Sequence, residues 1–255
     1  MAEFFTTFLV LDSSALDQLQ RLIDGVPFAV WETVYTTVLS TFFAYLLGLP
    51  LGVMLVVGEE QGIHPLPKLL MSVVNVVINL LRSVPFLILM VMVIPLSRLI
   101  LGTSIGTTAT IIPLIVAAFP FVARMVESSL RELDHGVIEA AQAMGCSTIQ
   151  IIWKVVLPES LPSLLSGATT AFITILSYGA MAGAIGGGGL GSMALNLGYQ
   201  RQKTLVLWGS VIVLVILVQI FQSIGTHLAI GMDHRITRID KRARRKNKPD
   251  KAGLL

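Results

Sequence analysis

Charged side chains are scarce in this sequence, since they make up only 13% of the 255 residues while 54% are hydrophobic. A soluble domain carries about 25% charged residues, so a soluble chain of this length would lack the polar groups needed to cover its surface. The composition therefore favours an integral membrane protein. Cysteine is nearly absent too, and the single Cys146 excludes an intrachain disulfide.

The common motifs of nucleotide and metal chemistry are also missing. No GxxxxGK[ST] pattern occurs, so we expect no ATP to bind through a phosphate loop. The run Gly186–Gly189 lacks a following Lys-Ser/Thr pair and is typical of a helix end with a sharp turn. The four histidines show no metal-ligand spacing. The sequence therefore predicts no catalytic residue, no metal site and no cofactor in this chain.

The few charges are unevenly distributed along the chain. Nine of the 18 lysines and arginines lie between Arg235 and Lys251, whereas the first 32 residues hold five acids and one base, Arg21. The N-terminus has no basic region before its first apolar stretch, so no cleavable signal peptide is expected. The basic tail directly follows an apolar stretch, which favours an orientation signal and a contact for anionic lipid over a nucleic-acid site.

Five stretches are apolar and long enough to cross a bilayer, which takes roughly 20 residues. They cover about 30–57, 70–96, 105–123, 164–185 and 205–230. The expected fold is an all-α membrane protein with an acidic segment over 1–29, five spans over 30–230 and a basic tail over 231–255. Lysine and arginine accumulate on the cytoplasmic side. The tail and the long loop over about 124–162 are therefore placed inside, and the N-terminus outside.

Prolines and one arginine fall within the second and third spans. Membrane helices tolerate Pro85, Pro113 and Pro120 because neighbouring helices satisfy the freed carbonyls, and we expect kinks there. Arg82 is unusual in a span. It either ends a partly interfacial helix over 66–81 and reaches the inner headgroups, or it is a buried functional arginine.

The fourth span is rich in small residues, with Gly179, Gly183 and Gly187 recurring every four positions. Such faces let helix backbones approach closely in lipid. They favour either packing within one chain or a helix that lines a central axis between two copies, since a two-fold dimer would supply ten spans around such a path. Met181 is the one bulky, flexible side chain among the small ones, and it either closes this path or simply packs. Beyond the glycine run, ALNLGYQRQK is expected to be a short outer segment available to an external partner.

The inside loop carries signals for short helices. An amphipathic helix is expected to follow the third span, to break at 134–136 and to be followed by a second helix that begins near Val137. Gly145 suits the position just after this second helix. Ser147 and Gln150 form a capping box for the next helix, and Pro158 is expected to stop it.

Three residues in the second helix of this loop suggest a contact with another protein. Glu139 lies in the first turn, where a carboxylate interacts favourably with the helix dipole. Ala140 and Ala141 keep their face thin, so that another surface can approach closely. The loop is either an interfacial connector or a docking element, and two capped helices with an alanine pair favour docking.

The loop resembles the coupling loop in membrane subunits of bacterial ABC importers, whose pattern is EAAxxxG followed after nine or more residues by LP. Here the pattern reads Glu139-Ala140-Ala141, Gly145 and Leu157-Pro158. Other stretches resemble the MetI-type permeases of methionine-uptake importers, and this likeness covers about Trp31 to Ala229. They are LRSVPFLILMVMVIPLSRLI, GTSIGTTATIIPL, AFPFVARMVE, SYGAMAGAIGGGGLG and LGYQRQ.

This resemblance implies a type I ABC importer permease that works as a homodimer in the bacterial cytoplasmic membrane. It implies two cytoplasmic ATPase subunits, which bind ATP and Mg, and an external methionine-binding lipoprotein. The residues implied to couple to the ATPase are Glu139, Ala140, Ala141, Met144, Gly145 and Pro158. Those implied to line the gate are Tyr178, Gly179, Met181 and Gly183.

Three alternatives stay open. An importer of the same class could carry another amino acid or a small peptide. A channel or secondary transporter would work without an ATPase but would need membrane-embedded acids, and Glu32, near the outer end of the first span, is the only acid near a span. A structural scaffold would not need the docking loop.

Overall fold

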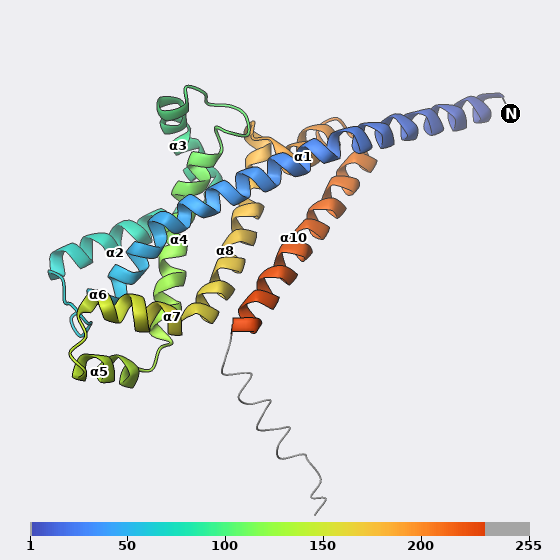
Figure 1. Cartoon of the computed structure of the whole chain (residues 1–255). Coiled ribbons are helices and arrows are strands. Elements are labelled where there is room, and N and C mark those ends of the chain that lie inside the picture. Colours follow the sequence, from blue (N-terminus) through green and yellow to red (C-terminus); the bar gives the residue numbers. More distant parts are fainter. Residues whose placement is uncertain (1, 233–255) are drawn as a thin grey trace, which may run out of the picture.

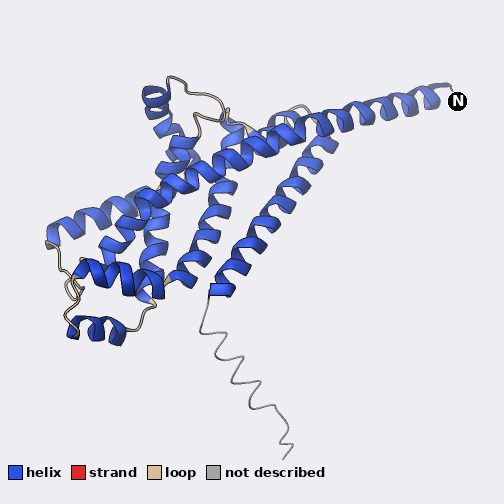
Figure 2. Ribbon diagram, in the orientation of Figure 1, coloured by secondary structure: helices blue, strands red, loops and turns tan. Residues whose placement is uncertain are grey.

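The computed structural model describes residues 2–232, and every regular element in that range is a helix (Figure 2). Of the predicted basic tail over 231–255, only Gly231 and Met232 belong to the described residues. Four helices are long and apolar enough to cross a membrane. They are α1 (Ala2–Val57), α4 (Ile111–Arg131), α8 (Leu161–Ala182) and α10 (Thr204–Met232).

Helix α1 is the longest element and includes most of the acidic N-terminal segment. Its 56 residues correspond to roughly 84 Å at 1.5 Å per residue, and its first part extends beyond the other helices (Figure 1). No break occurs at residue 30, where the sequence suggested a boundary. Asp17 accepts a hydrogen bond from Lys203 at 2.9 Å, and Gln18 accepts one from the backbone N–H of Leu205 at 3.2 Å. The segment therefore holds the outer end of α10.

The second span is not the single helix that the sequence predicted over 70–96. It consists of α2 (Lys68–Ser83) and α3 (Phe86–Leu101), which are bent by 110° relative to each other. The residue before a proline is driven away from helical backbone angles, and Val84 is accordingly extended before Pro85. Pro85 thus separates two helices instead of kinking one. Counting the bent pair as one span, the chain has the five expected crossings.

Helix α2 is amphipathic, as the interfacial-helix alternative for 66–81 requires. Met71 and Ile78 are buried on one face, whereas Leu69, Val73 and Leu80 are exposed on the other. A separation of seven residues, about two helical turns, places the buried pair on one side of the helix. Arg82 is exposed in the last turn of α2.

Helix α4 forms the centre of the bundle and packs against α1, α2, α3 and α8 (Figure 1). Its Ala118, Val122 and Val126 are almost fully buried. Two glycines of α1 make the close approach possible, since a Cβ on Gly48 would lie 2.7 Å from Val122 and one on Gly52 would lie 2.6 Å from the Ala123 carbonyl oxygen. Small residues of this kind allow helices to pack tightly in lipid.

The third span also extends further than the sequence suggested. The amphipathic helix expected after Ala123 is not separate, because α4 continues unbroken to Arg131. Pro113 lies in its first turn, where a missing N–H costs nothing, and Pro120 is the proline inside it. The polar residues after Ala123 therefore extend this helix toward the loop that the sequence predicts to lie inside.

The outer segment between α8 and α10 folds back into the bundle. It contains the 3-10 turn η2 (Gly183–Ile185), the short α9 (Gly189–Ser192) and the π-helix η3 (Met193–Tyr199). Gly186 and Gly189 have positive φ angles of 94° and 79°, which confirms the predicted sharp turn. The predicted outer segment over 194–203 is not available along its whole length, because Ala194 and Gly198 are buried.

Polar contacts from α1 hold this outer segment in place. The Glu32 carboxylate accepts hydrogen bonds from the Thr107 hydroxyl and, at 2.7 Å, from the Gly189 N–H. The Thr33 hydroxyl accepts one from the Leu190 N–H at 2.9 Å. A half-buried acid is stable here because its oxygens have donors. Glu32 therefore has a structural partner at the outer end of the first span.

The glycines of the fourth span divide into two environments, which yields a test of packing. A Cβ on Gly183 would lie 2.2 Å from the Ser192 backbone nitrogen, whereas one on Gly179 would meet nothing within 4 Å. We expect Gly183→Ala to destabilise the purified protein by about 1–3 kcal/mol through overpacking. The matched Gly179→Ala variant should unfold at or above the wild-type temperature. Equal midpoints for the two variants in thermal unfolding would contradict this assignment.

Candidate functional site

The inside loop folds into a compact knob at the end of the bundle where α5, α6 and α7 lie together (Figure 1). Helix α5 spans His135–Ala143, so it begins two residues before the predicted Val137. The Asp134 carboxylate accepts a hydrogen bond from the Gly136 N–H at 2.8 Å and caps the first turn. The break after α4 is thus a capped helix start.

Gly145 forms the corner of the knob, as the sequence predicted. Its φ angle is +75°, and a Cβ there would meet nothing within 4 Å. The Gly145 N–H donates to the Gln142 carbonyl and the Cys146 N–H donates to the Ala141 carbonyl. This pair of bonds is the Schellman arrangement that ends helices at a left-handed residue. Backbone conformation, not space, therefore requires glycine at this position.

The predicted capping box after the corner is also confirmed. The Ser147 N–H donates to the Gln150 side chain at 2.9 Å, and the Gln150 N–H donates to the Ser147 hydroxyl at 3.4 Å. The box opens α6 (Thr148–Ile151), which continues as the π-helix η1 (Ile152–Val156) and then α7 (Leu157–Glu159).

Pro158 does not stop this helix, contrary to the prediction. It lies within α7, directly after the π-helical turn. In a regular α-helix a proline ring clashes with the carbonyl group four residues earlier. The wider turn of η1 changes the position of that carbonyl relative to Pro158, so that the clash is avoided. The chain reorients two residues later at Ser160, before α8 begins at Leu161.

The two alanines of the knob have different roles, which corrects the prediction of one shared thin face. Ala141 is 1% exposed and belongs to the same buried cluster as Leu130, Ile151 and Val156. Ala140 is exposed. The other exposed residues predicted for coupling are Glu139, Met144, Gly145 and Pro158. A docking surface on α5 therefore contains Ala140 but not Ala141.

An ion network anchors the end of α4, from which the knob emerges. Glu127 is 8% exposed and binds Arg124 at 2.6 Å and Arg131 at 2.9 Å. Arg131 also binds Glu59 through both carboxylate oxygens, at 2.9 and 2.6 Å. Arg124 donates further to Asn75 at 2.7 Å. The network ties α4 to α2 and to the chain just after α1.

The bridge between Arg131 and Glu59 is sensitive to acid. The hydrogen bonds from Arg131 lower the pKa of Glu59 below its ordinary value. The ionised carboxylate stabilises the fold in full at pH values at or above the pKa that Glu59 has in the unfolded chain. This contribution is lost as the pH falls through the lower pKa that Glu59 has in the folded protein. The bridge therefore stays formed at neutral pH, and its contribution is small because both side chains are about half exposed.

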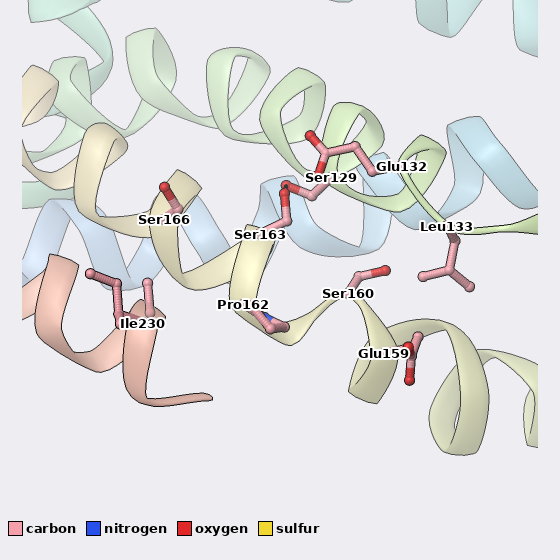
Figure 3. Close-up of a pocket in the computed structure, with 10 residues that line it drawn as sticks. Ser129, Glu132, Leu133, Glu159, Ser160, Pro162, Ser163, Ser166 and Ile230 are labelled. Atoms are coloured by element: carbon pink, nitrogen blue, oxygen red, sulfur yellow. Dashed lines mark hydrogen bonds between the residues drawn. The ribbon is translucent and has the colours of Figure 1, made fainter. Parts of the chain in front are cut away.

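Three adjoining cavities line the inner half of the bundle beside α8. The innermost, of about 380 Å³, is lined by Ser129, Glu132 and Ser160 among others (Figure 3). The next, of about 320 Å³, shares Ser129, Glu132, Ser163 and Ser166 with it. The third, of about 170 Å³, shares Arg82 and Phe121 with the second and ends at Phe86 and Tyr178. The three cavities therefore adjoin one another along this side of the bundle, and we refer to them together as the polar recess.

Hydroxyl groups form a stripe along the α8 face of this recess and beyond it. They belong to Ser163, Ser166, Thr170, Thr174 and Ser177, whose spacing of three or four residues places them on one side of a helix. Thr170 and Ser177 donate to backbone carbonyls of their own helix, which leaves hydroxyl lone pairs free to accept. The stripe was visible in the sequence as a period of three and four, but sequence reasoning did not identify it.

The predicted gate residues do not share one environment. The Tyr178 ring stacks on Phe86, with centroids 4.3 Å apart and planes 6° from parallel, and both residues line the cavity of about 170 Å³. Met181 lines a separate apolar groove between α8 and α10. Gly179 faces open space and Gly183 packs on Ser192. Of the four, only Tyr178 lines one of the three cavities described above.

Most of the sequence that forms this bundle and its knob matches a known family of transport proteins. The family model described as binding-protein-dependent transport system inner membrane component matches residues 48–234. The chain belongs to this family. It is a multi-pass membrane permease subunit of a transport system.

Individual relatives place the chain more closely within the family. A protein of Vibrio cholerae serotype O1, named a probable D-methionine transport system permease protein MetI, is 48% identical over 81% of this chain and 92% of its own length. The D-methionine transport system permease protein MetI of Escherichia coli K12 is 49% identical over 60% of this chain and 70% of its own.

Solved structures agree with the fold. A chain of the MetNI methionine ABC transporter, in an inward-facing conformation, has a TM-score of 0.80 and 43% identity, covering 86% of this chain and 99% of that one. A chain of an amino acid ABC transporter shares the fold at a TM-score of 0.62 with 20% identity. The five-span importer-permease architecture predicted from the sequence is thus confirmed.

The corner of the knob yields a second test. A non-glycine residue in left-handed backbone costs roughly 1–2 kcal/mol, and asparagine tolerates it better than alanine. We expect Gly145→Ala to speed amide hydrogen exchange across 135–151 by about tenfold, which corresponds to 1.4 kcal/mol, and Gly145→Asn to do so less. Exchange in Gly145→Ala that matches the wild type would show that the corner carries no conformational cost.

Proposed function

We propose that this chain is the membrane subunit of an ATP-driven ABC importer that moves methionine or a close analogue across the bacterial cytoplasmic membrane. The carrying observation is the 43–49% identity to methionine transporter subunits over most of the fold, together with the exposed, doubly capped knob. ATP and Mg are bound and ATP is hydrolysed by partner subunits, and this chain has no catalytic role of its own.

The proposed assembly contains two copies of this chain, two cytoplasmic ATPase subunits and an external substrate-binding lipoprotein. Five crossings make a thin bundle, and the exposed hydroxyl stripe of α8 lies along an open face instead of inside the chain. A second copy facing this stripe would enclose an aqueous path between two polar surfaces. The basic tail places the knob and the C-terminus in the cytoplasm and the N-terminus outside.

Coupling to the ATPase is assigned to the outward face of α5 and its corner. Glu139, Ala140, Met144 and Gly145 are exposed there, and Met144 is 76% exposed. Because Met144 is apolar, highly exposed and next to Gly145, which has no side chain, a partner protein could approach closely and bury it. The buried cluster that joins Ala141 and Ile151 of the knob to Leu130 of α4 transmits displacement of the knob to α4.

The gate is assigned to the outer end of the recess. Tyr178, stacked on Phe86, closes the recess at this end. Met181 lies one helical turn further along α8, at the end of the hydroxyl stripe. Gly179 has open space for a second copy of α8 to approach. Gly183 contributes by holding the outer segment against α8.

Docking of the ATPase is testable by charge reversal and bulk on α5. We expect Glu139→Lys and Ala140→Trp to abolish co-purification of the partner ATPase and uptake, with the permease still monodisperse in detergent. Glu60→Lys is the matched control, since Glu60 is an exposed acid near the same end whose bridge to Lys68 is 70–80% exposed and worth little.

The two alanines separate docking from folding. Ala141→Trp should destabilise the permease itself, because it overfills a site that is 1% exposed. Intact co-purification and uptake with both Glu139→Lys and Ala140→Trp would refute the coupling assignment. Transport by the permease alone, without any ATPase, would favour a channel or secondary transporter.

A further inference from the structure

Two successive residues of α1 hold the outer segment between α8 and α10 where its glycine turn ends. The Glu32 carboxylate accepts hydrogen bonds from the Thr107 hydroxyl and, at 2.7 Å, from the Gly189 N–H. The Thr33 hydroxyl accepts one from the Leu190 N–H at 2.9 Å. Because these two side chains bind two successive N–H groups of the outer segment, we call Glu32 and Thr33 the outer clamp.

The residue before this contact is a glycine because the clamp lies so close to it. Gly188 has an extended backbone with a φ angle of −86°, a conformation that does not require glycine. A Cβ there would lie 2.6 Å from a Glu32 carboxylate oxygen, and the nearest atoms that it would meet all belong to the side chains of Glu32 and Thr107. Close approach of the clamp, and not backbone strain, therefore requires glycine at this position.

The same outer segment packs on the turn of α8 that carries the proposed gate. Gly191 lies so close to Ala180 that an added Cβ would overlap the backbone of that residue. The Asn196 side-chain amide donates a hydrogen bond to the Gly183 carbonyl at 3.2 Å. Gly191 also lines the apolar groove that contains Met181. The outer segment therefore connects the clamp on α1 to the gate residues on α8.

The Glu32 carboxylate is held by neutral donors. None of the ion pairs within residues 15–232 includes Glu32, and its two hydrogen bonds come from a hydroxyl and a backbone N–H. Hydrogen bonds to an ionised acceptor are roughly twice as strong as those between neutral groups. A carboxylate in this place therefore holds the outer segment firmly through two acceptor oxygens at fixed positions.

We propose that Glu32 is a positioning residue of the outer gate, which seats the outer segment on α8 and thereby keeps the outer end of the transport path closed. Its carboxylate acts as a paired hydrogen-bond acceptor for Gly189 and Thr107, and not as a carrier of protons or ions. Without the clamp, the outer segment separates from the turn over 180–183, and substrate escapes outward while ATP is still hydrolysed. The proposal rests on the proposed importer function and names a residue of α1 that controls its outer gate.

Three substitutions separate positioning from proton or ion coupling. In Glu32→Gln the side-chain oxygen accepts from the Gly189 N–H and the amide donates to the Thr107 oxygen, so both contacts persist without a charge. A carboxylate that carries a proton or an ion across the membrane has no such neutral substitute. Glu32→Ala removes both contacts, and Gly188→Ala displaces the clamp from the other side, because its methyl group would meet Glu32 and Thr107.

The test uses the assembled complex in proteoliposomes with enclosed ATP and external binding protein, and measures radiolabelled methionine imported per ATP hydrolysed. We expect this ratio to fall about tenfold in Glu32→Ala and to fall in Gly188→Ala, with ATP hydrolysis retained in both, whereas Glu32→Gln should keep most of it. The double variant should lie no lower than Glu32→Ala, because both changes break the same contact. In the purified permease, amide hydrogen exchange across 186–198 should be faster in Glu32→Ala than in Glu32→Gln.

Asp24→Ala is the matched control, since Asp24 is an exposed acid about two helical turns earlier on α1. An equal fall in Asp24→Ala, or an unchanged ratio in Gly188→Ala, would overturn the proposal. A fall in Glu32→Gln as deep as that in Glu32→Ala would assign Glu32 to proton or ion coupling instead. If Glu32→Ala does not assemble, Gly188→Ala and Glu32→Gln decide by the same criteria. Wild-type complex that imports no methionine would reject the importer function itself, whereas exchange across 186–198 that is equal in all variants would reject the clamp.

Discussion

The buried carboxylate of Glu127 is the contact on which the inner half of this structure depends. It is almost fully removed from solvent, and a buried charge is tolerated only when opposite charges and hydrogen bonds surround it. Arg124 and Arg131 meet that requirement from the same helix, and they extend the network to Asn75 on α2 and Glu59 after α1. Two separate segments are therefore held at fixed positions around the end of α4. The knob begins at Asp134, three residues after Arg131, so its placement follows from this network.

The bend between α2 and α3 explains how a permeable recess forms beside such a tightly packed helix. A straight second span would have placed one continuous row of apolar residues against α4 and α8. Because Pro85 separates α2 from α3, the last turn of α2 ends at the recess with Arg82, and the first turn of α3 contributes Phe86, which stacks on Tyr178. Arg82 and the Phe86–Tyr178 stack are thus brought to the same cavity by one break in the chain.

Local signals in the knob were predictable because each depends on a few neighbouring residues. Gly145 and the Ser147–Gln150 box are confirmed, since a left-handed corner and a reciprocal cap have specific residue requirements. The consequence of Pro158 was not predictable, because a π-helical turn immediately before it changes the register of the clash. The division between Ala140 and Ala141 was also hidden. The pattern shows two small residues, but only the packing of α5 on Leu130 and Ile151 decides which one is buried.

Composition, charge asymmetry and short motifs by themselves determined that this is a helical membrane protein with five crossings and a structured inside loop. Those properties follow from hydrophobic length and local backbone chemistry, which act over a few residues. Tertiary structure alone decided that the second span is broken and that Glu127 pairs with two arginines, while Arg82 pairs with no residue within 15–232. It also decided that Ser163, Ser166 and Thr170 line one cavity with Glu132. These depend on which helices meet. Residues about fifty positions apart, such as Asn75 and Arg124, come together only in a packing arrangement that buries the apolar surface and also gives each buried charge a partner.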